Sequence, residues 1–235
     1  ALVVASFFTV TSFALAGNVI GVTGTLAKIE ASGTETEGTA ADTSDRSKSV
    51  DNTAGYGSIY LEHIRDNGIA IGLEYVPFSA DVSDQVHSRT DTSQAGSGEG
   101  RSGTTVNTAA AEIENYRTVY VELPRGAAYL RLGFSQVDVN TQEAQITNGG
   151  TYGDATLDGY NIGLGLKTET DNGLQVKFNV QYTDFEDLDL SSSTNNSINA
   201  DLDLTTVNLS VGMFLIVLLP NFTSYFVIVP SSNNV

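Results

Sequence analysis

Apolar and polar residues alternate with a period of two along much of the chain, and no long stretch shows the period of a helix. The clearest example runs from Leu174 to Thr183, where Leu, Val, Phe, Val and Tyr alternate with polar residues. Each such run is about ten residues or longer, the length that a tilted membrane-spanning strand needs. Eight strands are therefore predicted, at about 18–31, 55–65, 69–82, 112–123, 127–140, 157–170, 174–188 and 204–215.

Short and long connections alternate between these strands. Asp66-Asn67-Gly68 and Asp171-Asn172-Gly173 predict type I′ hairpin turns, because Asn-Gly tolerates the positive φ angles that such turns demand. Pro124-Arg125-Gly126 predicts a third short turn. An outer-membrane barrel keeps this strict order, with short periplasmic turns and long external loops, whereas soluble sandwiches rarely do. The polar segments, predicted to be flexible loops, lie at about 32–54, 83–111, 141–156 and 189–203.

The first 16 residues, ALVVASFFTVTSFALA, carry no charge and end in small residues at Ala14 and Ala16. An apolar stretch followed by such a site is typical of a secretory signal peptide. The basic segment that normally precedes it and an initiator Met are missing, so we interpret residues 1–16 as a signal peptide truncated at its N-terminus. The alternative is a buried N-terminal helix or strand. A membrane-spanning helix would need about 20 residues.

Composition narrows the function. The 235 residues include 11 Lys and Arg against 28 Asp and Glu, a net charge of -17, and this acidity disfavours binding to nucleic acid. The chain has no Cys, which excludes disulfides, Cys-ligated zinc and thiol catalysis, and only 2 His. Its 10 Tyr and 10 Phe suit a β-rich protein better than a helical one.

Together these features resemble the small Gram-negative outer-membrane β-barrels, the OmpA/OmpX-like or "porin family" proteins. The resemblance rests on the order of the apolar leader, the alternating strands, the Asp-Asn-Gly turns and the closing run Val207 to Met213, over about residues 1–215. It implies an all-β fold: an eight-stranded antiparallel up-and-down transmembrane β-barrel with short periplasmic turns and long extracellular loops, in the cell outer membrane. The barrel domain is assigned to residues 17–215. The resemblance implies no single activity.

The chain departs from this family at its C-terminal end. An aromatic residue usually ends the last strand on the lipid-facing register, where this chain has Leu215, and Phe214 stands where a polar residue is normal. Residues 216–235 are apolar without alternation, and Pro220 makes them a poor spanning helix. We interpret this tail as a frameshift or read-through extension. The alternative is a hairpin around Pro220 that adds a ninth and a tenth strand.

The apolar register of the strands is predicted to face lipid, because unpaired polar groups in hydrocarbon are costly. Tyr75, Tyr160 and Tyr182, near strand ends, are candidates for the interfacial aromatic girdles. Alternation alone also fits a soluble barrel with these residues in its core; the leader and the loop asymmetry favour the membrane. The predicted lipid-facing residues are Ile69, Ile71, Leu73, Leu130, Leu132, Phe134, Ile162, Leu164, Leu166, Val176, Phe178 and Val180.

The opposite register is then predicted to line the lumen. An eight-stranded barrel is just wide enough for side chains to fill it, and buried charges need partners, so we expect a packed polar network with no open channel. Glycines on this register, such as Gly72, Gly133 and Gly165, either relieve crowding or leave gaps for a narrow water path. The predicted lumen charge network consists of Glu62, Glu74, Glu122, Arg131, Lys167 and Lys177.

The predicted loops are acidic, for example at Glu35, Asp42 and Asp187, and we interpret them as solvated surface. Divalent cations bound by clustered carboxylates are the alternative, although no metal site is assigned. His63 is predicted at the periplasmic rim and His87 in a flexible loop, so neither is preorganised for catalysis. No catalytic residue, enzyme activity or cofactor is expected.

The expected protein is an integral, structural outer-membrane barrel with surface-interaction loops and a mostly plugged polar lumen. The alternative is a small porin-like channel for passive diffusion of ions or small solutes. Outer-membrane lipid and lipopolysaccharide and the barrel-assembly machinery are the expected partners, with divalent cations at the acidic loops as a further option. No nucleic-acid partner is expected, and the chain is expected to be a monomer.

Overall fold

The computed structural model describes residues 17–36, 45–81, 87–92, 104–144, 152–192 and 197–215. All regular structure within these residues is β-strand. None of them forms a helix of the length and hydropathy needed to cross a membrane. The leader predicted at 1–16 and the tail predicted at 216–235 lie outside the described residues.

The described residues form one antiparallel sheet of 11 strands. The strands are β1 (Gly17–Thr36), β2 (Asp45–Ile64), β3 (Ala70–Tyr75), β4 (Ala80–Asp81), β5 (His87–Thr92), β6 (Thr104–Arg125), β7 (Ala128–Ala144), β8 (Ala155–Glu169), β9 (Leu174–Phe185), β10 (Leu188–Ser191) and β11 (Ser197–Leu215).

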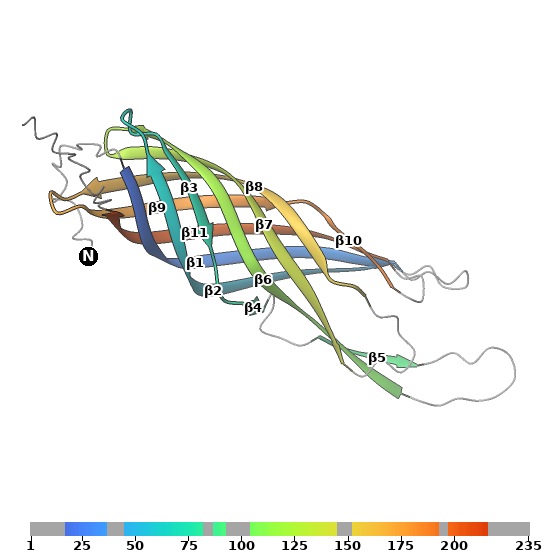
Figure 1. Cartoon of the computed structure of the whole chain (residues 1–235). Helices are drawn as coiled ribbons and strands as arrows, with labels where there is room; N and C mark the ends of the chain where they lie inside the picture. Colours follow the sequence, from blue (N-terminus) through green and yellow to red (C-terminus); the bar gives the residue numbers. More distant parts are fainter. Residues whose placement is uncertain are drawn as a thin grey trace, which may run out of the picture.

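The sheet closes on itself (Figure 1). Neighbours follow the chain from β1 through β2, β3, β6, β7, β8 and β9 to β11, and β11 pairs back onto β1 from Leu215 opposite Asn18 to Ser197 opposite Thr36. The short strands only extend these positions: β4 and β5 pair with β6, as β3 does, and β10 pairs with β11, as β9 does. The chain is therefore an eight-stranded up-and-down β-barrel, as the alternation predicted.

The two ends of the barrel differ. β1 begins and β11 ends at the end that holds the tight turns between β2 and β3, β6 and β7, and β8 and β9, which we call the turn end (Figure 1). We call the opposite end the loop end.

Glycine closes two of the tight turns. Gly68 donates its N–H to the Arg65 carbonyl at 2.8 Å and Gly173 to the Thr170 carbonyl at 2.9 Å. These glycines have φ angles of 79° and 78°, whereas the Asn before each has a negative φ. A type I′ turn needs positive φ at both central residues, so that prediction was wrong: each is a type I turn followed by a left-handed glycine.

The strands extend further toward the loop end than the sequence predicted. Much of 32–54, 141–156 and 189–203 was predicted to be loop, yet β2 begins at Asp45 and β11 at Ser197. In this part of β11, Leu202 and Leu204 are buried inside the barrel and alternate with exposed Asp201 and half-buried Asp203. Sparse apolar residues at every second position were enough to fix a strand there.

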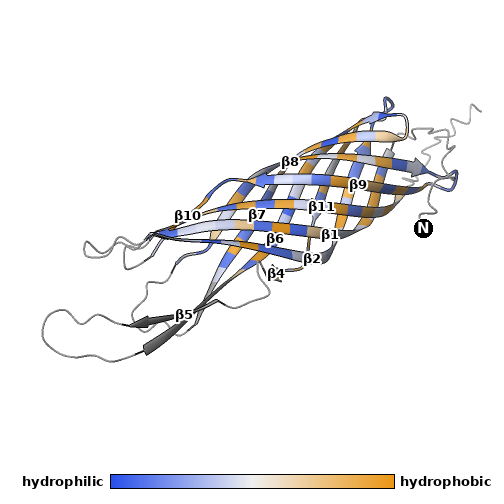
Figure 2. Ribbon diagram, turned by 180° about the vertical axis from the view of Figure 1, so that it is seen from behind, coloured by the Kyte–Doolittle hydropathy of each residue, from blue (hydrophilic) through white to orange (hydrophobic). Residues whose placement is uncertain are grey.

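In the turn-end half, apolar side chains point outward and polar ones inward. On β1, Ile20, Val22 and Leu26 are exposed, whereas Thr23 and Thr25 are buried. Figure 2 shows the resulting alternation of hydrophobic and hydrophilic positions along the strands.

The outward apolar positions form a band of limited height. On β11 this band runs from Val207 to Leu215, about 26 Å of strand at about 3.3 Å per residue. With a tilt of about 40°, it covers about 20 Å of depth, close to the apolar band of about 25 Å on outer-membrane barrels.

The arrangement inverts in the loop-end half. On β1, the apolar Leu26 still points outward. Beyond it, the apolar residues Ala27 and Ile29 are buried inside the barrel, and the charged Lys28 is exposed. The buried cluster that fills this half is apolar and is drawn from five strands: Ala27, Ile29, Val137, Val139, Leu157, Phe185, Leu202 and Leu204. This half therefore has the apolar core and polar exterior of a water-soluble barrel.

Tyrosine rings occupy the space that lumen glycines leave. A Cβ atom on Gly72 would lie 2.3 Å from Tyr120 Cζ, one on Gly165 2.3 Å from Tyr129 Cζ, and one on Gly212 2.2 Å from Tyr60 Oη. These three glycines therefore relieve crowding, and the rings fill the gaps beside them.

Substitution of Gly72 by Ala should destabilise the barrel by about 1–3 kcal/mol, because the new methyl group would overpack a ring that Arg131 and Glu62 hold in place. Equilibrium urea unfolding in detergent micelles measures the effect. Gly24→Ala is the matched control, since a Cβ there meets nothing within 4 Å. Equal stability of the two variants would contradict the crowded lumen.

Candidate functional site: the barrel lumen

The turn-end half of the lumen holds the predicted charged residues. Glu62, Glu122, Arg131, Lys167 and Lys177 are buried, and the side chain of Glu74 is 15% exposed. They come from six different strands. On each strand every second side chain points into the lumen, and these six residues occupy such positions. Three acidic and three basic groups thus face one another inside the barrel.

Five of these six side chains form one ion-pair chain. The Lys177 ammonium pairs with Glu62 and lies 3.1 Å from Glu122 Oε1. Arg131 continues the chain, with Nε 3.3 Å from Glu122 Oε1 and Nη1 2.9 Å from Glu74 Oε2. The pair between Glu62 on β2 and Lys177 on β9 crosses the lumen, because β1 and β11 separate these strands around the wall.

Tyrosine rings pack against both cations of the chain. The Arg131 guanidinium carbon lies 3.6 Å from the centre of the Tyr120 ring, and Lys177 Nζ lies 4.5 Å from the centre of the Tyr60 ring. Tyr120 also donates its hydroxyl to Glu62 Oε1 at 2.7 Å. Each cation is therefore held by carboxylates and by an aromatic face, which favours it electrostatically.

Lys167 lies beside this chain without joining it. It is directly opposite Lys177 on the neighbouring strand, and its Nζ has no hydrogen-bond partner among the described residues. Like charges opposite one another on adjacent strands are destabilising. Of the six predicted residues, the structure thus links five and leaves the sixth at the edge of the cluster.

Removal of the two lysines should have opposite consequences. Lys177→Met should destabilise the barrel by about 3–5 kcal/mol, because it leaves the buried Glu62 and Glu122 short of a cation. Lys167→Met should be neutral or stabilising, because it removes a buried cation that repels Lys177. Equilibrium unfolding in micelles compares the two, and a larger loss for Lys167→Met would show that the pairing is wrongly assigned.

Aromatic rings separate the charged half of the lumen from the apolar half. Tyr116 packs edge-on against Tyr56 and Phe185, with ring centres 6.5 and 6.1 Å apart. The tyrosine hydroxyls have partners in the polar half, Thr25 for Tyr56 and Ser135 for Tyr116. The prediction of a polar lumen is thus incomplete, because the interior is apolar beyond these rings.

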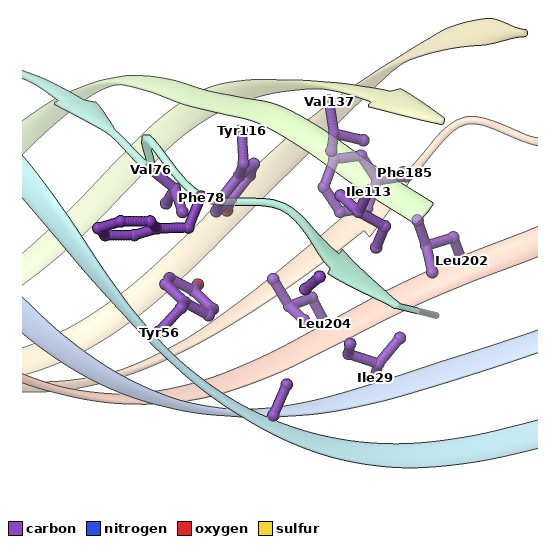
Figure 3. A pocket seen from close by; sticks show the side chains of 12 residues that line it. Ile29, Tyr56, Val76, Phe78, Ile113, Tyr116, Val137, Phe185, Leu202 and Leu204 are labelled. Carbon is purple, nitrogen blue, oxygen red and sulfur yellow. The ribbon is translucent and has the colours of Figure 1, made fainter. Parts of the chain in front are cut away.

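An apolar cavity of about 40 Å³ lies in the loop-end half (Figure 3). Apart from the two tyrosines, only hydrocarbon side chains line it. The labelled lining residues come from most strands of the barrel and from the segment after β3, where Val76 and Phe78 lie. Sequence reasoning missed this cavity, although the switch of apolar residues from even positions (Leu130, Leu132) to odd positions (Val137, Val139) was a usable signal.

At the turn end, Phe214 helps to close the lumen. It is half-buried and packs against the buried cluster of Val19, Tyr60, Ile64 and Ala70. An apolar ring at this inward position therefore supplements the charged chain.

The outer face carries the residues predicted to contact lipid. Ile69, beside the first turn, and Leu130 and Val176 are half-buried. The other nine are exposed on the outer surface: Ile71, Leu73, Leu132, Phe134, Ile162, Leu164, Leu166, Phe178 and Val180.

Aromatic residues mark the loop-end edge of this band. Tyr75, Tyr160 and Tyr182 are all exposed, and Tyr160 packs edge-on against Phe134 at 5.7 Å between ring centres. Tyr75 donates its hydroxyl to Asn115 and Tyr182 donates to Asp203 at 2.6 Å. The rings of Tyr75 and Tyr182 thus lie beside the band, and their hydroxyls bond to polar residues, as the tyrosines of an interfacial girdle do.

The described histidine and acidic residues form no cluster that could hold a metal ion. His63 is exposed near the turn end, with Nδ1 3.0 Å from Asn18 Oδ1. The side chain of His87 lies outside the described residues. Within the described ranges, no three His, Cys, Asp or Glu residues come together as metal ligands.

Two carboxyl groups meet beyond the band. Asp187 is hydrogen-bonded to Asp201, and this bond, followed by the negative charges of Asp201 and Asp189, raises the pKa of Asp187 above its ordinary value. A carboxyl whose pKa is raised by folding contributes stability below its unfolded-state pKa and loses it as the pH rises through the folded-state pKa.

Asp201→Asn should therefore return the Asp187 pKa toward its ordinary value. The stability that this carboxyl contributes should then depend less on pH. Carboxyl ¹³C chemical shifts, titrated with pH in micelles, measure the Asp187 pKa directly. An ordinary Asp187 pKa in the unmodified chain would refute the contact.

No family model matches the chain, and no curated protein matches its sequence. Solved structures with a similar fold include OprG from Pseudomonas aeruginosa, with a TM-score of 0.47 and 11% identity over 85% of this chain and 97% of that one. AlkL has a TM-score of 0.46 and 12% identity over 92% of this chain and 100% of that one. The protease OmpT from Escherichia coli has a TM-score of 0.40 and 9% identity over 87% of this chain and 99% of that one.

All three are outer-membrane proteins. At these scores and identities, neither a role nor a location carries over from them. Both must come from this chain's own side chains.

Proposed function

We propose that the chain is an integral β-barrel of the Gram-negative outer membrane, with a lumen closed to ions and a loop end available for surface interactions. The observation that carries the closure is the ion-pair chain from Glu74 to Glu62, which crosses the lumen and whose two cations pack against tyrosine rings.

The membrane position is supported by the outward apolar band. Pairing between β1 and β11 gives hydrogen-bond partners to the backbone groups of the first and last strands. A strand in hydrocarbon needs such partners, because no water is there to supply them. Exposed large apolar residues then surround the barrel over about 20 Å of depth, with aromatic residues at the loop-end edge. Such a surface would be an aggregation liability in water. The turn end then faces the periplasm, since short turns of outer-membrane barrels lie there.

The closed lumen is supported by charge balance and burial. The linked groups carry three negative and two positive charges, and Lys167 supplies a third positive charge nearby. Moving an ion past them would require breaking buried pairs, each of which leaves an uncompensated charge. The role of the protein then rests on its outer wall and its loop end, where strands continue beyond the apolar band. The porin-like alternative would require this chain to open.

Planar-bilayer conductance tests the closure. The refolded chain, shown to be folded by circular dichroism and by heat-dependent gel migration, should give no discrete current steps. The variant with Tyr60→Ala and Tyr120→Ala should give steps, because it removes two rings that fill the lumen beside the ion pairs. Reproducible, ion-selective steps from the unmodified chain would contradict closure and favour the channel.

A further inference from the structure

Charged side chains on the outer face differ between the two edges of the apolar band. Beyond the loop-end edge, carboxylates lie opposite one another on four neighbouring strands: Asp51, Glu30, Asp203 and Asp184. Beyond the turn-end edge, the outward register of the described strands carries no carboxylate but three basic residues: His63, Arg65 and Arg125. The turn end is therefore the exception in a chain with a net charge of -17.

The three basic residues follow directly on the apolar band. On β2, the outward register passes from the exposed Leu61 to His63 and then to Arg65, the first residue after the strand. On β6, it passes from the exposed Leu123 to Arg125, the last residue of the strand. A long basic side chain at such a place lies along apolar surface and holds its charge in the headgroup layer of a bilayer.

Two exposed bases nearer the loop end are paired with carboxylates of the barrel itself. Lys28 Nζ lies 2.5 Å from Glu30 Oε1. Arg117 Nη1 lies 3.5 Å from Asp138 Oδ2. These cations therefore have a partner within the chain.

The two arginines at the turn end are not paired in this way. Within the described ranges, no carboxylate lies at ion-pair distance from the guanidinium of Arg65 or Arg125. Asp66 follows Arg65 in the chain and is exposed, so the two positive charges outnumber the negative charge beside them. This excess of positive charge favours an anionic partner from outside the chain.

An apolar strip lies between the two arginines. β3 pairs with β2 on one side and with β6 on the other (Figure 1). Two strand spacings, roughly 10 Å, therefore separate β2 from β6. The outward residues Ile71 and Leu73 of β3 are exposed. A lipid whose chains lie on β3 would thus have its headgroup between Arg65 and Arg125.

Hydrogen-bonding groups surround Arg65. A shallow, open pocket beside it is also lined by His63, Asp66 and Asn67. His63 donates its Nδ1–H to Asn18 Oδ1 at 3.0 Å, because that oxygen can only accept, and its Nε2 has no partner among the described residues. The pocket therefore offers polar groups to the hydroxyls of a glycerol headgroup, beside a cation for its phosphate.

We propose that Arg65 and Arg125 bind the phosphate of an anionic phospholipid of the phosphatidylglycerol type, whose acyl chains lie on β3. The proposal rests on the membrane position proposed above and adds a lipid class and a site in the leaflet at the turn end. Arginine suits this role because its planar guanidinium donates parallel hydrogen bonds to a phosphate. A free phosphate ion shares this chemistry but has no chains for β3 to hold.

Quenching of a single tryptophan by brominated lipids tests the proposal. The chain contains no Trp, so Ile71→Trp introduces a reporter without background on β3, between the two arginines. The variant is refolded into bilayers of phosphatidylcholine and phosphatidylglycerol, with bromine on the acyl chains of one lipid or of the other. Comparison of the two quenching levels gives the relative affinity for phosphatidylglycerol. Phe178→Trp on β9, three strands from both β2 and β6 around the wall, is the control reporter.

The reporter on β3 should show a preference for phosphatidylglycerol of roughly threefold or more, and the reporter on β9 a ratio near one, because only the first has cations beside it. Combined Arg65→Gln and Arg125→Gln should remove the preference. Combined Arg65→Lys and Arg125→Lys should keep part of it, because the charges remain. Arg117→Gln, which removes an exposed arginine nearer the loop end, is the matched control and should leave the preference unchanged.

The failures of this proposal and of the membrane position are distinguishable. Strong quenching of both reporters without a preference on β3, or a preference that survives the double Gln variant, would overturn the lipid site and leave the membrane position standing. Absence of quenching at both reporters, in chains shown to be folded by heat-dependent gel migration, would overturn the membrane position. Loss of the preference when inorganic phosphate replaces chloride at constant ionic strength would assign the arginines to a free phosphate and overturn the lipid.

Discussion

The pairing of β11 with β1 is the constraint on which the rest of the structure depends. It joins the first and last strands from Asn18 opposite Leu215 to Thr36 opposite Ser197, so that neither leaves a free edge. A spanning sheet must close in this way, because hydrocarbon offers no partner to an exposed N–H or carbonyl. Closure also divides every strand into an inward and an outward register, and the chemistry of each half of the barrel follows from what those registers carry.

The two registers exchange their character once along each long strand. Between Leu26 and Ala27 on β1, between Phe134 and Val137 on β7, and between Leu204 and Val207 on β11, the apolar residues move from one face to the other.

In the proposed membrane position, lipid surrounds the turn-end side of this switch and demands apolar residues outside, so the narrow lumen receives the polar ones. Water would surround the loop-end side and reverse the demand. One barrel therefore contains a charged cluster and an apolar cavity, separated by the rings of Tyr56, Tyr116 and Phe185.

The sequence predicted the features that depend on which face of a single strand each residue occupies, that is, on whether its position is odd or even. The run from Leu174 to Thr183 specified a strand and its two faces, and the inward position of Lys177 followed from that parity. The partners of Lys177 did not follow from parity, because its contact with Glu62 depends on the curvature of the whole sheet. Nor did parity show that Tyr60 and Tyr120 would fill the space beside the glycines, since a lumen glycine fits both a gap and a ring.

Other features left signals that were available but not used. Pro77 should have ended the strand predicted at 69–82, because it cannot donate to a ladder. The change of parity between Leu132 and Val137 should have indicated an apolar interior where a loop was expected to begin. The extension of β2 to Asp45 was harder to predict, since its outer part contains few apolar residues and is held mainly by its pairing with β1.

Spin labels along β1 test most directly that the switch of register marks the membrane surface. The chain contains no Cys, so single cysteines introduced at each position from 19 to 30 can carry the label without background. In refolded proteoliposomes, labels at positions 20, 22 and 26 should be accessible to oxygen and shielded from a water-soluble nickel complex. Labels at 28 and 30 should show the reverse, and those at 23 and 25 should be shielded from both. Free access of the nickel complex to positions 20, 22 and 26 would contradict a lipid-facing band and the orientation of the barrel derived from it.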